Sequence, residues 1–310
     1  MALNPRSDTA GPRNAGPGWG YGFLRRADRV LPARLFDFLL GLGTWAAVAT
    51  MPAQRRHSRE YLTLILGRPA TLREVWRHFF TFMRMFLLRL RLAEGRTHNC
   101  RAVSGCEEFM ALMASDRPAM LGTFHMGNSD LLGFFFRQFR RRVFMVRLRV
   151  GNSPDTDHLT DRFAPWVTFI WVNEAASLLF ALKEAAQSGG SIALKCDRIE
   201  HAAKLESFEF LGARRLFPFT IYHLALVFRR PVVFCVSVPG AADESLVHGW
   251  PIFEPDDESK AANLARARAH FQSVLTKVEV LLRANPFLWF NFTQLNPPAG
   301  TSAPSGSPPC

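Results

Sequence analysis

Pro118-Ala-Met-Leu-Gly-Thr-Phe124 is followed directly by His125-Met-Gly-Asn-Ser-Asp130 and then by the apolar run Leu-Leu-Gly-Phe-Phe-Phe136. The first part is short, mostly apolar and bounded by polar residues, which predicts a buried parallel strand. Asn128 or Ser129 can cap a helix that begins at Asp130. His125 is then expected at the carboxyl end of a strand, where open α/β sheets form their ligand crevice.

The spacing of His125 and Asp130 suits acid–base chemistry. A neutral imidazole accepts a proton at one ring nitrogen, while a carboxylate on the other nitrogen fixes the tautomer and stabilises the imidazolium. We therefore predict that His125 is a general base and that Asp130 orients it. A hydroxyl activated in this way would attack an acyl carbonyl without an enzyme nucleophile. Because His-x4-Asp also arises by chance in a chain with nine His, the strand-to-helix context carries this prediction.

Strand-like and helix-like segments alternate after this motif, which is the pattern of an α/β domain. The apolar strands suit a mixed, mostly parallel sheet flanked by helices. Strands are predicted at 142–150, 166–172, 191–196, 207–211 and 231–238, and helices at 174–187, 217–228 and 258–284. The chain has no glycine-rich phosphate loop and no Gly-x-Ser-x-Gly elbow. These absences argue against nucleotide-dependent transfer and α/β-hydrolase chemistry.

Composition narrows the class of partner. The chain has 310 residues, 48% of them apolar, and a formal net charge of +12, which fits one catalytic domain with a helical extension and an anionic partner. Nucleic acid, an anionic membrane surface and an acidic carrier protein are the candidates. Since no nucleic-acid-binding motif is present, we expect no nucleic-acid partner. The five Cys lack paired or metal-ligand spacing and are expected to be free thiols, with no metal site.

Four regions are predicted along the chain. Residues 1–18 and 296–310, rich in Pro, Gly, Ser and Ala, are expected to be disordered. Residues 19–95 are expected to form a helical membrane-associating region, and residues 96–295 the α/β domain. Leu35–Met51 is apolar but shorter than the roughly 20 residues of a spanning helix, and arginines flank it on both sides. We expect it to lie at an anionic interface, with a spanning helix as the alternative.

Basic and polar side chains gather after the motif. Guanidinium groups bind phosphate and carboxylate oxygens bidentately, although a solvated face is the ordinary reading of a charge run. The arginines are Arg137, Arg140, Arg141, Arg142, Arg147 and Arg149. Polar residues at several strand ends would share one crevice. The predicted substrate-binding residues are Asn128, Arg149, Asn152, Arg162, Asp197 and Arg198.

These motifs together resemble the lysophospholipid acyltransferase superfamily, and within it the lipid A late acyltransferases. His125-Met-Gly-Asn-Ser-Asp130 is similar to that branch's His-x-Gly-Asn-x-acid form of the His-x4-Asp/Glu box. Weaker similarities follow in chain order. They are Arg149 with Asn152, Arg162, Asp197, Phe210-Leu-Gly212, Ala225, Pro231-Val-Val233 and Pro286-Phe-Leu-Trp289, which is similar to a closing Pro-x-x-Trp. The chain departs from the pattern at Phe217-Pro-Phe-Thr220, where the family has a Gly, and it lacks a clear spanning helix.

The resemblance implies a membrane-associated acyltransferase at the cytoplasmic face of a bacterial inner membrane. It implies transfer of a fatty acyl chain from acyl carrier protein, or else from acyl coenzyme A, to a hydroxyl of a lipid A precursor or related glycolipid. No cofactor is implied. An acceptor of another kind, such as a phospholipid or a polyene-type product, stays open. A non-catalytic basic protein that binds a membrane surface or nucleic acid is the alternative from a different class.

Overall fold

The computed structural model describes residues 18–148, 166–172, 175–199, 202–241 and 244–295. Its centre is a seven-stranded sheet in the order β1-β9-β8-β2-β5-β3-β4. Only the β8–β9 pair is antiparallel among these neighbours. The strands are β1 (Asn99–Ala102), β2 (Met120–Thr123), β3 (Val143–Arg147), β4 (Val167–Trp171), β5 (Ser191–Lys195), β8 (Val232–Pro239) and β9 (Glu244–Gly249). The predicted mixed, mostly parallel α/β fold is confirmed.

Alternation along the central strands builds two cores, one on each face of the sheet. Met120 and Phe234 belong to a core covered by α8 (Ala175–Gln187), α9 (Thr220–Phe228) and α10 (Lys260–Ala284). Their neighbours Leu121 and Val233 face the other core, which is covered by α5 (Glu107–Ala114) and α6 (Leu132–Gln138). This explains why β2 and β8 are mostly apolar, since both sides of each strand are buried.

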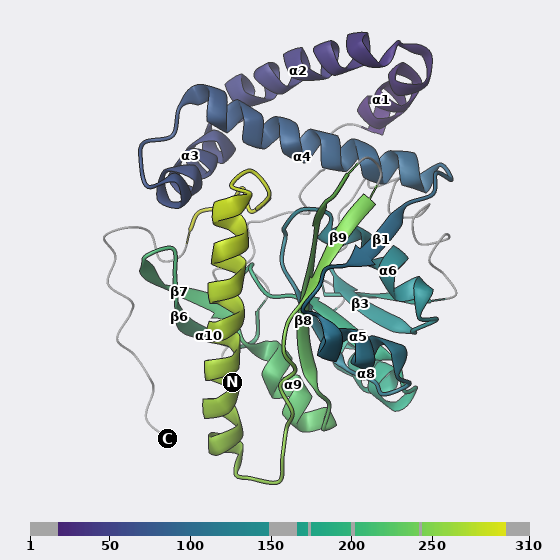
Figure 1. Cartoon of the computed structure of the whole chain (residues 1–310), viewed down its shortest axis with the longest axis vertical. Helices are drawn as coiled ribbons and strands as arrows, with labels where there is room; N and C mark the ends of the chain where they lie inside the picture. Colours follow the sequence, from purple (N-terminus) through teal and green to yellow (C-terminus); the bar gives the residue numbers. More distant parts are fainter. Residues whose placement is uncertain (1–17, 149–165, 173–174, 200–201, 242–243, 296–310) are drawn as a thin grey trace.

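A small antiparallel hairpin, β6 (Leu205–Phe210) and β7 (Ala213–Pro218), lies beside α10 (Figure 1). Its register pairs Phe208 with Arg215. The prediction of a helix from 217 is wrong at its start, because the chain remains extended through Pro218 and α9 begins at Thr220. Four elements were not predicted: β1, α5, β7 and β9.

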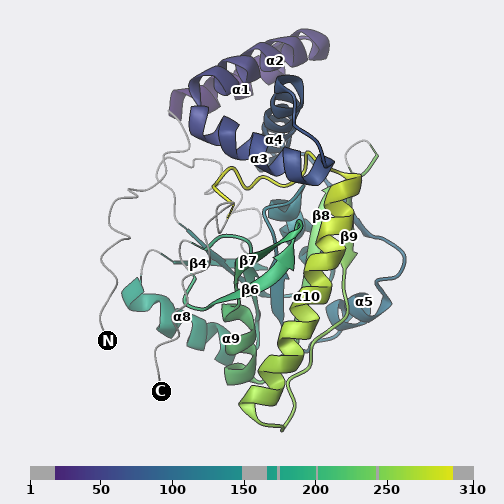
Figure 2. The same ribbon diagram turned by 90° about the vertical axis from the view of Figure 1, so that its left-hand side faces the viewer.

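The N-terminal part of the described chain is helical. It comprises α1 (Gly18–Val30), α2 (Ala33–Thr50), α3 (Pro52–Leu66) and α4 (Leu72–Ala93). Helix α4 begins at a capping box, in which Thr71 accepts from the Glu74 amide and Glu74 accepts from the Thr71 amide. Figures 1 and 2 both place these helices together at one end of the molecule, with α4 next to the sheet and α2 outside it.

Helix α2 carries apolar residues on two faces. Its buried face packs against α4, where the Trp76 indole donates to the Gly41 carbonyl at 3.1 Å and the Trp45 and Trp76 rings stack. The opposite face is exposed and consists of Leu35, Phe38, Leu39 and Leu42, with the partly exposed Trp45 at its edge. Among the described helices, none alone has the length and apolar character of a membrane span. The pair α2 and α3 meets those criteria together but is bent by 98°.

Candidate active site

His125 lies just beyond the carboxyl end of β2, as predicted from its sequence context. Parallel pairing aligns Thr123 of β2 with Lys195 of β5. Two residues further along each strand, His125 and Asp197 therefore stand side by side. The Asp197 carboxylate accepts from the His125 amide at 2.8 Å and meets His125 Nδ1 at 2.7 Å. One carboxylate thus fixes both the backbone and the ring of His125.

The environment of this pair sets its protonation. Burial lowers the pKa of His125 to about 4, although the Asp197 charge opposes this shift. Burial alone would raise the pKa of Asp197, but the charge and hydrogen bonds of His125 hold it below its ordinary value. Asp197 is therefore ionised and His125 neutral near pH 7, with the proton on Nδ1. The His125 side chain is 21% exposed while that of Asp197 is fully buried, so Nε2 is the nitrogen open to a substrate.

The residues after His125 form a tight turn that only glycine fits. Gly127 has a φ of +50°, and a Cβ there would collide with the Ser237 carbonyl oxygen. The Gly127 amide donates to the Leu288 carbonyl at 2.7 Å, and the Asn128 amide donates to the Ser237 carbonyl at 2.6 Å. These bonds fix the loop that carries His125 between β8 and the segment after α10.

Asn128, predicted as a substrate-binding residue, makes its side-chain hydrogen bond within the protein. Its buried side chain donates to Ser245 Oγ at 2.7 Å, and that oxygen also contacts His98 Nε2 at 2.7 Å. The predicted helix cap is also wrong, because neither Asn128 nor Ser129 makes a side-chain cap bond. Ser129 instead donates to the Met126 carbonyl at 2.5 Å. A 3₁₀ turn, Ser129–Leu131, precedes α6.

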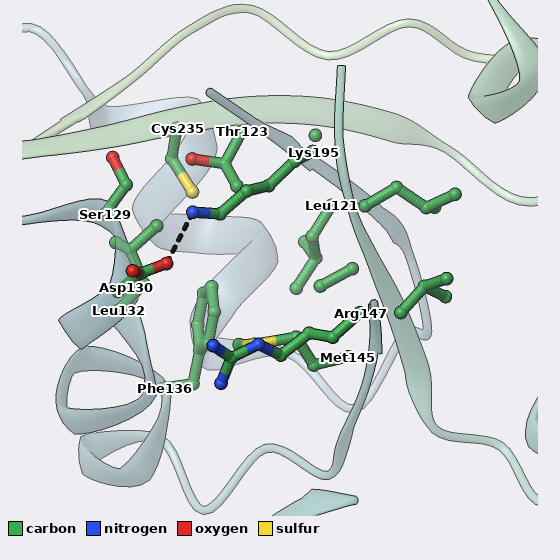
Figure 3. Close-up of a pocket in the computed structure, with 14 residues that line it drawn as sticks. Leu121, Thr123, Ser129, Asp130, Leu132, Phe136, Met145, Arg147, Lys195 and Cys235 are labelled. Carbon is green, nitrogen blue, oxygen red and sulfur yellow. Dashed lines mark hydrogen bonds and ion pairs between the residues drawn. The ribbon is translucent and has the colours of Figure 1, made fainter. Parts of the chain in front are cut away.

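Asp130 does not orient His125, which corrects the predicted pairing. Its carboxylate pairs with Arg89 Nη1 of α4 at 3.0 Å and with the Lys195 ammonium of β5 (Figure 3). Burial by itself would raise the pKa of Asp130, but the charges of Lys195, Arg89 and Arg147 hold it well below its ordinary value. The physical reason is competition, because two cations hold the Asp130 carboxylate while Asp197 occupies the Nδ1 side of the imidazole.

We refer to Asp130 with Lys195, Arg89 and Arg147 as the Asp130 cluster. A small pocket borders this cluster, as Figure 3 shows. Its volume of about 20 Å³ is close to that of one water position. Asp130, Lys195 and Arg147 give it a charged side, and its remaining wall is largely apolar. The apolar part includes Leu121, Leu132, Phe136, Met145, Ala193 and Cys235. Charged and apolar groups therefore meet close to the carboxyl end of β2.

The other predicted ligands divide into two groups. Arg149, Asn152 and Arg162 lie outside the described residues. Arg198 lies next to Asp197 and donates to the Phe290 carbonyl at 3.4 Å. Asp197 is the orienting carboxylate of His125, which differs from the substrate-binding role predicted for it.

The arginine run after α6 is not a uniform surface. Arg141 is buried and donates to the Arg117 carbonyl at 2.8 Å and the Ser115 carbonyl at 2.6 Å. It therefore stabilises the chain around the end of α5. Arg137, Arg140 and Arg142 are exposed. Among the described arginines of this run, these three are the exposed ones, and we regard them as the candidates for contact with an anionic partner protein.

Two residues of the site, Lys195 and Arg89, were missed by sequence reasoning, and Trp289 was noted there only within the Pro-x-x-Trp similarity, without a role. Trp289 Nε1 donates to Asp197 Oδ2 at 2.9 Å. Within the described part of the chain, no group of three or more His, Cys, Asp or Glu side chains could hold a metal ion. Cys100, Cys106, Cys196 and Cys235 are free thiols, as expected.

Comparison with known proteins gives few relatives. No family model matches the chain, and no curated protein matches it. Among solved structures, the chain is similar to the 1-acyl-sn-glycerophosphate acyltransferase PlsC from Thermotoga maritima. The TM-score is 0.40 at 15% identity, over 81% of this chain and 98% of that one. A similarity at this identity and TM-score gives no basis for assigning a function to this chain.

Proposed function

We propose that this protein is a membrane-associated acyltransferase that moves a fatty acyl chain from a thioester to a lipid hydroxyl. The observation that carries the proposal is the contact of 2.7 Å between His125 Nδ1 and Asp197 Oδ1. It leaves a neutral imidazole with Nε2 open at the carboxyl edge of a parallel sheet, where such sheets form their ligand crevice. The residue pattern from His125 to Asp130 resembles the His box of the lysophospholipid acyltransferase superfamily.

The reaction needs one base and no covalent intermediate. His125 Nε2 takes the proton of the acceptor hydroxyl as the oxygen attacks the thioester carbonyl carbon. Asp197 stabilises the imidazolium that forms. The tetrahedral intermediate collapses with cleavage of the C–S bond, and the imidazolium returns its proton to the departing thiolate. The products are an ester and a free thiol.

The Asp130 cluster is suited to an anionic part of the substrates. Lys195, Arg89 and Arg147 surround a single carboxylate, so the cluster has excess positive charge. Phosphate groups on the acceptor, or the phosphopantetheine arm of a carrier, are anions of the kind that such cations attract. We propose a lipid A precursor or related glycolipid as acceptor, and acyl carrier protein before acyl coenzyme A as donor.

The exposed apolar face of α2 supports a membrane location. Phe38 on this face is 62% exposed, and exposed arginines flank the helix at Arg34 and Arg56. An apolar helical face between cations is the pattern of a helix lying in the headgroup region of an anionic leaflet. Helix α4 connects that face to the site, since its Arg89 reaches Asp130. We propose that the protein docks in this way on the cytoplasmic face of the inner membrane.

Acyl transfer by the purified protein tests this function. Radiolabelled acyl carrier protein and acyl coenzyme A are offered with vesicles that contain a lipid A precursor or, in parallel, lysophosphatidate. We expect labelled ester on the lipid A precursor, faster with the carrier protein. Transfer to lysophosphatidate alone would replace the proposed acceptor. No transfer from either donor to either lipid would contradict the enzymatic function and favour a non-catalytic membrane-surface protein.

A further inference from the structure

A chain of hydrogen bonds runs from α3 and α4 to the carboxylate behind His125. Ser58 Oγ contacts His78 Nδ1 at 2.8 Å, and His78 Nε2 contacts the Trp289 carbonyl oxygen at 2.9 Å. The Trp289 indole then donates to Asp197 Oδ2 at 2.9 Å. Ser58 and His78 are 1% and 0% exposed. Buried polar side chains whose hydrogen bonds are satisfied are held rigidly in a single arrangement.

The direction of each bond follows from the chemistry of the groups. A carbonyl oxygen only accepts, so His78 Nε2 carries the proton and its Nδ1 accepts from the Ser58 hydroxyl. The indole N–H only donates, so Asp197 must accept from it. Burial lowers the pKa of His78 to about 4, which keeps the ring neutral near pH 7. The ring is otherwise surrounded by the aromatic groups Tyr61, Phe290 and Phe292.

Trp289 belongs to a segment that is fixed against the His125 loop. The Phe290 amide donates to the His125 carbonyl at 2.7 Å, and Met126 forms an antiparallel bridge with Trp289. The indole packs edge-on against Tyr61 and Phe210, with ring centroids 5.1 and 5.5 Å apart. Since the backbone and the ring of Trp289 are both held, its N–H is aimed at Asp197.

We infer that Trp289 is a positioning residue for the general base, and that Ser58 and His78 hold it in place. The inference rests on the proposed function, because it assigns these residues to the same reaction. Asp197 Oδ2 accepts from the indole and from the His125 amide, which leaves Oδ1 directed at His125 Nδ1. Without the indole N–H, the carboxylate can rotate about its Cβ–Cγ bond and lose its alignment with the imidazole.

Trp289→Phe tests the inference, because it removes the donor and keeps an aromatic ring. We expect kcat to fall roughly tenfold, as for loss of one charge-assisted hydrogen bond, with unchanged KM for donor and acceptor. We also expect the pKa of His125 to fall further, since a carboxylate that loses its alignment with the imidazole stabilises the imidazolium less. The other charged groups that act on His125, Lys195 and Arg198, stay in place. A role in packing alone predicts no such fall.

The pKa of His125 can be followed without acyl transfer. Diethyl pyrocarbonate modifies the neutral imidazole, so the rate of His125 modification across pH, read by peptide mass spectrometry, reports its deprotonated fraction. A fall in the pKa of His125 in Trp289→Phe supports the inference. An unchanged or raised pKa in a folded variant overturns it. If the parent protein transfers no acyl group, the proposed function is overturned, and this measurement still decides whether Trp289 positions Asp197.

Variants of His78 separate positioning from packing. His78→Leu breaks the chain and should reproduce the Trp289→Phe effects, whereas His78→Gln keeps a donor for the Trp289 carbonyl and should restore most of kcat. His270 is the matched control, since its ring lies between the Tyr222 hydroxyl at 2.5 Å and the Pro251 carbonyl at 2.8 Å. His270→Leu should leave kcat and the pKa of His125 unchanged. Equal effects in His270→Leu, or no rescue by Gln in a folded His78 variant, overturn the inference.

Discussion

Asp197→Asn is the substitution that best distinguishes the role of Asp197 from that of Asp130, the two carboxylates near His125. Asp197 accepts three hydrogen bonds, from the His125 amide, His125 Nδ1 and the Trp289 indole. An asparagine has one acceptor oxygen and one donor amide in the same space. If the oxygen faces the His125 amide and the indole, the amide group faces Nδ1 and forces the imidazole proton onto Nε2. The base is then protonated at the nitrogen that must accept.

The size of the effect can be worked from these contacts. The equivalent tautomer error in Ser–His–Asp triads lowers kcat by about 10⁴, so we expect a loss of roughly 10³–10⁴. If the asparagine turns the other way, its amide group meets two donors, at a cost of about 2 kcal/mol in the free energy of unfolding. That corresponds to a fall in Tm of roughly 4 °C for a chain of this size.

Asp130→Asn should show the opposite balance of effects. It leaves Arg89 and Lys195 without their carboxylate, and breaking a buried ion pair costs about 3 kcal/mol, or roughly 6 °C in Tm. The tautomer of His125 is unaffected, so the folded variant should keep a far larger share of kcat than Asp197→Asn. Initial rates of acyl transfer and thermal melts of both variants provide the comparison. The reasoning is refuted if folded Asp197→Asn works within tenfold of the parent while Asp130→Asn is inactive.

Four further substitutions probe other parts of the molecule. Phe38→Glu should weaken binding to anionic vesicles at least tenfold in a flotation assay, whereas Phe180→Glu, on α8 and even more exposed, should not; equal loss in both would contradict docking through α2. Gly127→Ala should lower Tm by several degrees, because it combines a positive φ with a collision at the Ser237 carbonyl; an unchanged melt would contradict the turn geometry. Arg142→Glu should raise KM for acyl carrier protein more than for acyl coenzyme A, and equal rises would contradict donor steering. His78→Gln should flatten the pH dependence of the free energy of unfolding. In the parent protein the folded pKa of His78 is lowered to about 4, so the unfolded chain binds more protons than the folded one between about pH 6.5 and 4. The stability of the parent protein therefore falls as the pH falls through this range. The parent should lose up to about 3 kcal/mol through this group over that window, and identical pH profiles for parent and variant would contradict a neutral buried His78.

Periodicity predicted the sheet well because its central strands are buried on both faces. The near-continuous apolar run from Val232 to Val238 could be recognised without knowledge of its neighbours. β1 is an edge strand of the sheet and β9 lies next to it. Burial is incomplete along β1 and alternates along β9, so their apolar pattern in the sequence was too weak to detect. The last two residues of the hairpin strand Ala213–Pro218 were assigned to a helix, because the apolar end of this strand runs straight into α9.

The site was only partly predictable, since spacing along the chain does not give strand order. His125 was found because its motif sits between a strand-like and a helix-like segment. Its partner was misassigned to Asp130, five residues away, because Asp197 becomes adjacent only when β2 pairs with β5 in parallel. A search for polar residues two positions beyond paired strand ends would have joined His125 with Asp197, once strand order was known. Arg89 reaches the site from α4, which no local pattern indicates, and the Pro-x-x-Trp similarity marked Trp289 without showing that its indole contacts Asp197.

The measurement that tests the proposed chemistry most directly is acyl transfer by the parent protein and by His125→Ala, side by side. Both proteins are incubated with the same labelled acyl carrier protein and vesicles of the lipid acceptor, after thermal melts have established equal folding. We predict labelled ester with the parent protein and a rate lower by about 10²–10⁴ with His125→Ala, the usual contribution of a general base. Equal rates in the two folded proteins would contradict the assignment of His125 as the base.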